Sequence, residues 1–276
     1  MAKSFKQLTT KDDNTILVVD ALNLAFRYKH QKKRDFADDY VRTVQSLAAS
    51  YNAGTILITA DWGSSSYRKN LLPEYKQNRK DKYAQQTEQE AEDFAEFMDD
   101  YEVTLITLEQ LYPVFRYKNV EADDIAAYLV SKLWRNNSMW LISSDRDWDL
   151  LIKPTVSRFS YVTRKEVTSS NWSEHYEVDQ EDYISFKCLT GDTGDNVPGI
   201  PGVGPKRAAA LIQMYGSAMD IADAMPLEGK YKYIQSTNEF GAEGIMKNYE
   251  LMDLVAYCED AVGVENVKDI DERIKS

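Results

Sequence analysis

The stretch Val120-Glu-Ala-Asp-Asp-Ile-Ala-Ala-Tyr128 joins an acidic cluster to the start of an apolar helix. Its carboxylates are Glu121, Asp123 and Asp124, and apolar side chains recur at every fourth position from Ile125 onward. The acids therefore occupy the first turn of the predicted helix, where the helix dipole favours negative charge. Acidic first turns are common, so this stretch alone is compatible with a structural role as well as with a metal site.

Aspartates that follow predicted strands favour the metal site. The apolar runs 15–19, 55–59 and 139–143 each lead within two residues to an aspartate. In an open α/β sheet the carboxyl ends of parallel strands meet at one crevice. An aspartate there can also simply cap the next helix, so the prediction depends on the repetition. The predicted metal ligands are Asp20, Asp61, Glu121, Asp123, Asp124, Asp145, Asp147, Asp192 and Asp195, and Asp149 is counted with the same cluster.

The residue types indicate which cation would bind. The chain has two histidines, His30 and His175, and two cysteines, Cys188 and Cys258, in no metal-ligand spacing. Carboxylates without His or Cys select Mg²⁺ or Mn²⁺. Two such ions about 4 Å apart can activate water and stabilise a leaving oxygen. We therefore expect two or more Mg²⁺ ions, with Mn²⁺ able to substitute, and no small-molecule cofactor.

Composition and charge limit the class of protein. Of the 276 residues 43% are hydrophobic, enough for a folded core, and no apolar run approaches the roughly 18 residues that span a bilayer. The start, Met1–Lys6, lacks the apolar region of a signal peptide. We expect a reduced, cytoplasmic monomer that binds no membrane. The net charge of −12 does not exclude a nucleic-acid partner, because ten of the acids belong to the predicted cluster.

Two basic segments predict contacts with nucleic acid. Residues 27–34 place five cations beside the first strand end, which suits a phosphate backbone; the predicted contacts are Arg27, Lys29, Lys32 and Lys33. Residues 67–83 interleave six Lys and Arg with three tyrosines, among them Tyr75 and Tyr83, which suits single strands. The acidic segment 84–100 is polar almost all round and predicts a projecting helix, with an ordinary surface hairpin as the alternative.

A helix–loop–helix is predicted between residues 181 and 215. Gly202-Val-Gly204 places consecutive backbone N–H groups at a helix start, which forms an anion-binding nest. Lys206 and Arg207 stand in the first helical turn, against the dipole preference, and a bound phosphate would explain them. The segment predicts a clamp that binds the DNA backbone without reading its sequence.

The motifs together resemble the structure-specific 5′-nuclease superfamily, in length and order most of all the stand-alone phage 5′–3′ exonucleases of the flap endonuclease type. They are Val120-Glu-Ala-Asp-Asp124, Tyr75-Lys76-x-Asn78-Arg79, Ser144-Asp145-x-Asp147 and Gly191-Asp192-x-x-Asp195-Asn-x-Pro-Gly-x-x-Gly-x-Gly-Pro-Lys206. The resemblance implies a Mg²⁺-dependent phosphodiesterase that cuts DNA with 5′ flaps or junctions of single and double strand.

The resemblance also implies roles for single residues. Asp20, Asp61, Glu121, Asp123 and Asp124 would serve one metal group, and Asp145, Asp147, Asp192 and Asp195 the other. Asp20, Asp123 and Asp145 would be catalytic, together with Lys76 and Arg79 at the base of a helical arch. The nest and Lys206 would hold duplex DNA, with a K⁺ ion in many relatives. The chain departs from the family at Gly194, where many relatives have Ser, and in its short, acidic arch.

The predicted fold is α/β, with a mostly parallel central sheet flanked by helices, a helical arch at about 66–100 and a C-terminal subdomain of the helix-hairpin-helix type. The predicted domains are residues 1–178 and 179–276. Three other classes of protein are alternatives. An aspartyl-phosphate enzyme requires an acid where Leu22 stands. Small RNases with a carboxylate pocket lack the clamp, and a catalytically silent DNA-binding module would not keep every carboxylate.

Overall fold

The computed structural model describes residues 12–275, so the segment Met1–Lys6 lies outside the described residues. By internal packing the chain divides into two units, which are described separately. The first contains the described residues up to Ser64, Gln86–Ser169 and those from Cys258 onward; the second contains Ser65–Gln85 and Ser170–Tyr257. The units therefore do not follow the single predicted boundary after residue 178, because the chain passes between them several times.

A six-stranded sheet forms the centre of the first unit, in the order β3-β2-β1-β4-β5-β6. The strands are β1 (Asp12–Asp20), β2 (Ala53–Thr59), β3 (Val114–Phe115), β4 (Ser138–Ile142), β5 (Val156–Phe159) and β6 (Glu166–Val167). All neighbours pair in parallel except β5 and β6. This confirms the predicted, mostly parallel sheet. Because β1 pairs with both β2 and β4, the strand order reverses at their carboxyl ends, where ligands bind in open α/β sheets.

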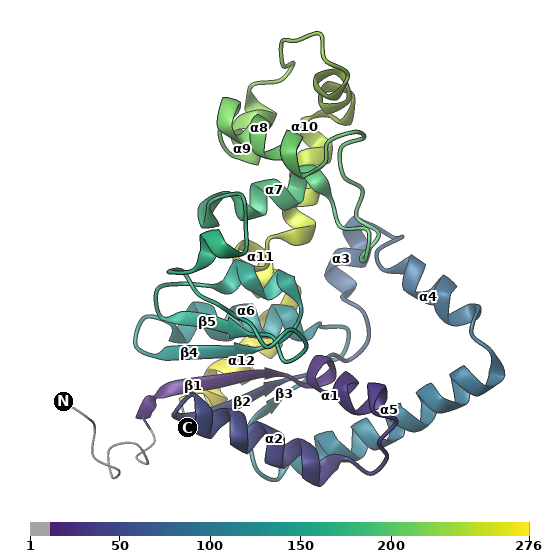
Figure 1. Ribbon diagram of the computed structural model, residues 1–276, viewed down its shortest axis with the longest axis vertical. Helices are drawn as coiled ribbons and strands as arrows, with labels where there is room; N and C mark the ends of the chain where they lie inside the picture. The colour runs from purple at the N-terminus through teal and green to yellow at the C-terminus, as the bar shows by residue number, and fades with distance from the viewer. Residues whose placement is uncertain (1–11, 276) are drawn as a thin grey trace. The chain divides into compact units, whose positions relative to one another are not determined.

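Helices cover the sheet because successive strand residues point to opposite faces. Leu17 and Val19 of β1 belong to a buried cluster with α1 (Ala21–His30), α2 (Ala37–Ser50) and α5 (Glu88–Glu109) (Figure 1). The helix predicted from the opening acidic stretch is α6 (Ala122–Leu133), and it packs on β1 and β2. A 3₁₀ helix, η1 (Arg146–Leu151), follows β4, and α12 (Val264–Arg273) ends the unit.

The structure corrects the prediction of a projecting polar helix at 84–100. α5 continues to Glu109, and its second half is packed into the core. Phe97, Tyr101, Leu105 and Leu108 recur every three or four residues and are all buried. This apolar stripe starts inside the acidic stretch and continues past its end. The end of the acidic stretch at residue 100 is therefore not the end of a helix, because one amphipathic helix continues through it.

The edge strands of the sheet are short. β5 ends at Phe159, where the chain turns back into β6, and β3 pairs with β2 only over Val114–Phe115. The three central strands β1, β2 and β4 contain the predicted apolar runs 15–19, 55–59 and 139–143, apart from the last residue of the third run.

The second unit is helical. Its elements are α3 (Ser66–Leu71), α4 (Gln77–Ala84), η2 (Trp172–Glu174), η3 (Gln180–Asp182), α7 (Tyr183–Thr190), α8 (Pro205–Tyr215), α9 (Ala218–Asp223) and α10 (Lys232–Met252), and α11 (Leu254–Val262) follows α10. α7, the loop and α8 form the predicted helix–loop–helix. Leu189, Ile200 and Leu211 are buried in one cluster with helices from the region after Ser217. Within residues 12–275 no helix is long and apolar enough to cross a membrane.

Candidate active site

Asp20 stands at the carboxyl end of β1, beside the point where the strand order reverses, and only 5% of it is exposed. Its Oδ1 accepts a hydrogen bond from the Asn23 N–H (3.2 Å) and its Oδ2 accepts one from the Ser143 hydroxyl (2.7 Å). Asp20 is therefore the N-cap of α1 and also an acid of the crevice. Burial, with the charges of Asp61 and Asp145, raises its pKa to about 8, against the two hydrogen bonds.

The start of α6 brings the opening acidic stretch to Asp61. Asp61 Oδ1 accepts a hydrogen bond from the Ala122 N–H at 2.9 Å, so this aspartate, which follows β2, caps α6. Glu121 and Asp124, at the start of α6, are also buried. Asp123 Oδ1 accepts a hydrogen bond of 2.6 Å from the indole N–H of the buried Trp148 in η1.

The acids after β4 are connected to those after β1. The Ser143 hydroxyl donates to Asp20 and accepts from the Asp145 N–H at 3.1 Å. Asp145 Oδ1 in turn accepts from the Asp147 N–H at 2.9 Å, which starts η1. A serine between the two strand ends thus holds Asp20 and Asp145 in one network.

Asp149 is not an acid of the crevice, and counting it with the metal cluster was wrong. It is fully buried, and both its carboxylate oxygens accept from the Arg158 guanidinium, at 2.5 Å from Nε and 2.8 Å from Nη2. Arg158 also donates to the Ser143 carbonyl at 3.0 Å. This buried bidentate pair joins η1 to β5. The bond from Arg158 to the Ser143 carbonyl helps to position the serine that donates to Asp20.

The donor set of the crevice fits a hard divalent cation. Asp20, Asp61 and Asp145 are close enough for their charges to repel, and Trp148 ties Asp123 to the same region. In the positions they hold here, no three His, Cys, Asp or Glu side chains of the described chain converge closely enough to hold a metal ion. A cation among the carboxylates would relieve the burial and repulsion that disfavour a charged Asp20. Oxygen-only ligands suit Mg²⁺ or Mn²⁺.

Asp195, in the loop after α7, has the opposite environment. Its carboxylate accepts from Arg79 Nη2 (2.5 Å) and the Tyr75 hydroxyl (2.9 Å), and Lys76 Nζ lies 3.5 Å away. The backbone adds a hydrogen bond from the Lys76 N–H to the Asp195 carbonyl (2.9 Å). Burial opposes ionisation, but Lys76, Arg79 and Tyr75 together lower the pKa of Asp195.

The same loop holds further parts of the predicted arch base. The Asn78 side chain donates to the Thr193 carbonyl at 2.6 Å, and the Asn196 side chain donates to the Glu74 carbonyl at 2.9 Å. Asp192 forms an ion pair with Lys187 at 3.6 Å. Gly191 is required by space as well as by its φ of +71°, because a Cβ there would lie 2.2 Å from the backbone nitrogen of Gly199.

The placement of Lys76 and Arg79 differs, and one expectation for residues 67–83 needs correction. Lys76 is the left-handed N-cap of α4, with φ 57°, and Arg79 lies within the helix. Both reach the Asp195 carboxylate. Tyr75 is 4% exposed and donates to Asp195, so it offers no stacking face, whereas Tyr83 is exposed. The sequence predicted an exposed Tyr75 because its neighbours in the chain are charged.

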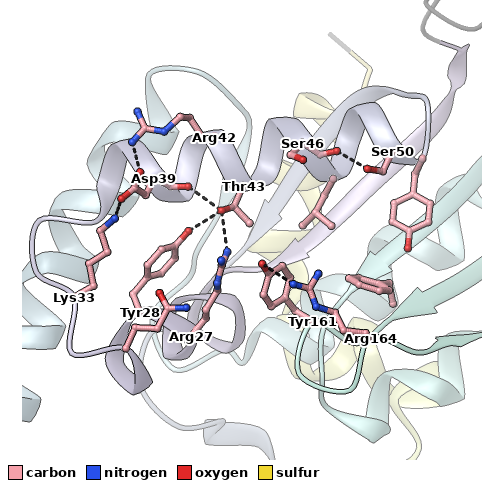
Figure 2. A pocket seen from close by; sticks show the side chains of 14 residues that line it. Arg27, Tyr28, Lys33, Asp39, Arg42, Thr43, Ser46, Ser50, Tyr161 and Arg164 are labelled. Atoms are coloured by element: carbon pink, nitrogen blue, oxygen red, sulfur yellow. Dashed lines mark hydrogen bonds and ion pairs between the residues drawn. The ribbon is translucent and has the colours of Figure 1, made fainter.

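The predicted DNA contacts Arg27 and Lys33 line a cavity of about 520 Å³ in the first unit (Figure 2). The guanidinium carbons of Arg27 and Arg164 lie 4.5 and 4.3 Å from the ring centroid of Tyr161. Lys33 forms an ion pair with Asp39 on the wall of the cavity. The cavity therefore presents two stacked guanidinium groups, a geometry suited to an anionic ligand.

Lys29 and Lys32 line a second cavity, of about 600 Å³, together with acids of α5. The Lys29 Nζ lies 4.3 Å from the ring centroid of Phe94, and Arg34 pairs with Glu96. The acidic first half of α5 is thus bonded to the basic segment through surface pairs. Such exposed pairs are individually weak and are screened by salt.

The clamp has the predicted local geometry. Gly202 has φ 77°, Gly204 is the N-cap of α8, and Pro205 occupies the first helical position. Lys206 is exposed in the first turn. Arg207 is used within the loop, where it donates to the Gly202 carbonyl at 2.6 Å. Lys206 is therefore accessible at the helix start, where the sequence predicts a phosphate contact.

Family models now place the chain. The model for the N-terminal resolvase-like domain of 5′-3′ exonucleases matches residues 15–177, and the model for their C-terminal SAM fold matches residues 178–272. The chain belongs to the 5′-3′ exonuclease family. The predicted membership in the 5′-nuclease superfamily is thereby confirmed, and so is the predicted combination of an α/β domain with a helical subdomain.

Individual members of the family are similar over nearly the whole chain. The flap endonuclease of Escherichia phage T5 is 43% identical over 275 residues, covering 95% of this chain and 93% of the relative. A structure of the T5 5′-exonuclease with bound zinc has a TM-score of 0.90 and 42% identity, covering 94% of this chain and 98% of that one. A T5 flap endonuclease complex with DNA and metal ions has the same TM-score and identity, covering 95% and 100%.

Sequence reasoning missed the residues that hold the acids of the crevice in place. Ser143, Trp148 and Arg158 carry no charge that a metal binds, so a search for carboxylates passes over them. One signal was available: Ser143 and Trp148 flank the acids of the segment after β4. Arg158 gave none, because its partner Asp149 lies nine residues away and in a different element.

Proposed function

We propose that the protein is a metal-dependent 5′ nuclease that hydrolyses phosphodiester bonds of DNA at 5′ ends and at junctions of single and double strand. The observation that carries the proposal is the buried Asp20, set beside Asp61 and Asp145 where the sheet order reverses. The T5 relative, named a flap endonuclease and similar over nearly the whole chain, supports the substrate class.

The carboxylates of the first unit would hold the cation. Asp20, Asp61, Asp123 and Asp145 are its principal ligands in this proposal, with Glu121, Asp124 and Asp147 as neighbours. When bound, Mg²⁺ ions supply an activated water and stabilise the leaving oxygen, and two of them would serve both ends of the displacement. The Ser143 hydroxyl links the Asp20 carboxylate to the backbone N–H of Asp145. Trp148 orients Asp123 by its indole N–H.

Lys76 and Arg79 would stabilise the charge that builds on the scissile phosphate. Both form ion pairs with Asp195. A phosphate of the substrate would compete with the Asp195 carboxylate for these two cations. A guanidinium or ammonium group that moves from the carboxylate to the phosphate has an anionic partner in both states. We assign Asp192 and Asp195 to the second metal group on the resemblance, so Asp195 would exchange its cationic partners for a metal when substrate binds.

DNA binding would use the clamp and the basic segments. The nest at Gly202–Gly204 and the exposed Lys206 would hold duplex backbone, with a K⁺ ion at the clamp as in many relatives. Arg27, Lys29, Lys32 and Lys33 would contact phosphates, and the exposed Tyr83 would stack on a base. In this proposal the protein acts as a monomer in the cytoplasm, that of the host if a phage encodes it.

The experiment is a cleavage assay on a 5′-labelled flap and a blunt duplex, each with and without Mg²⁺. Cleavage near the junction of the flap is expected only with Mg²⁺, while excess chelator leaves binding of the flap measurable, because the clamp and basic segments are not metal ligands. That binding should fall steeply with salt as phosphate contacts release counterions. Cleavage that persists in excess chelator would refute the metal-dependent mechanism.

A further inference from the structure

Tyr101 carries the buried hydroxyl that the fold does not account for. It lies in the second half of α5, 1% exposed, and its hydroxyl has no hydrogen-bond partner in residues 12–275. Tyr40, in the same hydrophobic cluster and equally buried, donates to the Ala21 carbonyl at 2.9 Å. Buried polar groups without a partner are rare in folded proteins, and each requires an explanation.

Packing places this hydroxyl near the acids of the crevice. Tyr101 lies in one buried cluster with Ala21 and Ala60, the residues next to Asp20 and Asp61 in the chain. Arg116 joins the same two segments, because its guanidinium forms a bidentate pair with Glu102, the residue after Tyr101, and donates to the Asp61 carbonyl at 3.3 Å. The charges of Asp61 and Asp20, after burial, raise the pKa of Tyr101, in agreement with this placement.

A purely structural role does not require the oxygen. The aromatic ring fills space in the cluster that α5 forms with the sheet, and phenylalanine would fill the same space. An oxygen that costs desolvation and makes no bond within residues 12–275 is explained if its partner moves into place in another state of the site. Metal ligands are regularly oriented by such outer hydrogen-bond donors.

We propose that Tyr101 is a positioning residue of the cation site, whose hydroxyl donates a hydrogen bond to the Asp61 carboxylate when a divalent cation draws the carboxylates together. The inference rests on the proposed metal-dependent function. It extends the site to α5, an element to which neither the acidic motifs nor the strand ends point. By this account Tyr101 touches no substrate and acts through Asp61 alone.

The test is Mn²⁺ binding to the full-length protein without DNA, followed by electron paramagnetic resonance, for the wild type and Tyr101→Phe. Removal of an outer-sphere donor typically weakens metal binding by about 10- to 100-fold. We expect Tyr101→Phe to bind Mn²⁺ at least tenfold more weakly, while its metal-free Tm equals or exceeds that of the wild type. The control is Tyr128→Phe, because the Tyr128 hydroxyl donates to Asp271 at 2.9 Å, and its Mn²⁺ binding should not change.

The outcomes separate this inference from the proposal on which it rests. Equal Mn²⁺ binding by wild type and Tyr101→Phe would overturn the role of Tyr101 and leave the metal site standing. A Tyr101→Phe protein that loses metal-free Tm along with Mn²⁺ binding would show a structural hydroxyl, and the role would be withdrawn. If the wild type itself bound no Mn²⁺, both the metal site and the role of Tyr101 would be rejected.

Discussion

The acids at the carboxyl ends of β1, β2 and β4 and the acid in the loop after α7 are carboxyl groups of the same kind in opposite surroundings. Asp20 is buried among other carboxylates, and its pKa is raised to about 8. Asp195 is also largely buried, yet Lys76 and Arg79 lower its pKa. Burial and neighbouring carboxylates disfavour the charged form of Asp20, which a bound cation would offset, whereas Asp195 has Lys76 and Arg79 as counterions within the protein.

The difference shows that a carboxylate motif does not by itself define a metal site. The carboxylates of the crevice repel one another, so the binding of a divalent cation among them is electrostatically favourable. At Asp195 a metal must compete with an ammonium and a guanidinium group that already hold the carboxylate. We therefore expect substitutions of the crevice acids and of Asp195 to change metal binding by different amounts.

The largest effect is expected at the strand end after β4. Asp145→Asn keeps the size of the side chain but removes a charge from the crevice, so metal should bind weakly and turnover should fall about a thousandfold, a loss of about 4 kcal/mol of barrier stabilisation. Raising Mg²⁺ or supplying Mn²⁺ should restore part of the rate, measured on a flap under single-turnover conditions. Asp179→Asn, an exposed acid, is the control. An equal loss in both variants would show that the site is wrongly assigned.

A smaller effect is expected at the arch base, where the cations that neutralise Asp195 are proposed to act on the phosphate. Lys76→Ala should lower the single-turnover rate about a hundredfold, or about 3 kcal/mol, because one charged contact to the transition state is lost. Flap binding should stay nearly normal. Tyr231→Ala, at an exposed side chain, should change neither quantity. If binding weakened in full proportion to the rate, Lys76 would be a docking contact without a catalytic role.

The smallest effects are expected in the stability of the metal-free protein, and here two acids should differ in sign. Asp149→Asn breaks the buried pair with Arg158 and leaves a buried charge, which typically costs 3–5 kcal/mol, so its Tm should fall by roughly 10 °C. Asp20→Asn removes a charge that the folded state disfavours above pH 4, so its Tm should rise by a few degrees at pH 7. Scanning calorimetry in chelator measures both. A fall in Tm for Asp20→Asn would mean that its cap and serine bonds outweigh the repulsion.

The sequence predicted the sheet well because its information is local. Runs of β-branched residues mark buried parallel strands, and the aspartates that follow β1, β2 and β4 stand where such strands must end. The helix–loop–helix was likewise readable from Gly202, Gly204 and Pro205, whose backbone requirements are specific. These features need no knowledge of distant neighbours.

What the sequence could not supply depends on contacts between distant segments. Asp149 looks like Asp145 and Asp147 in the sequence, and only Arg158 in β5 distinguishes it. Tyr75 lies in a charged segment, and its burial depends on a loop about 120 residues away. The prediction ended the polar helix at residue 100, where the acidic stretch stops, but the apolar stripe that packs α5 into the core continues past it. In each case the deciding partner lies outside any local pattern.

We propose that the crevice acids bind a divalent cation without DNA, whereas Asp195 is held by its own cations. Calorimetric Mn²⁺ titrations of Asp61→Asn, Asp195→Asn and the wild type, all without DNA, distinguish the two groups. We expect Asp61→Asn to weaken the tightest Mn²⁺ binding at least about tenfold, and Asp195→Asn to stay within twofold of the wild type. An equal or larger loss of Mn²⁺ affinity in Asp195→Asn would show that the crevice acids do not form the cation site that works without DNA.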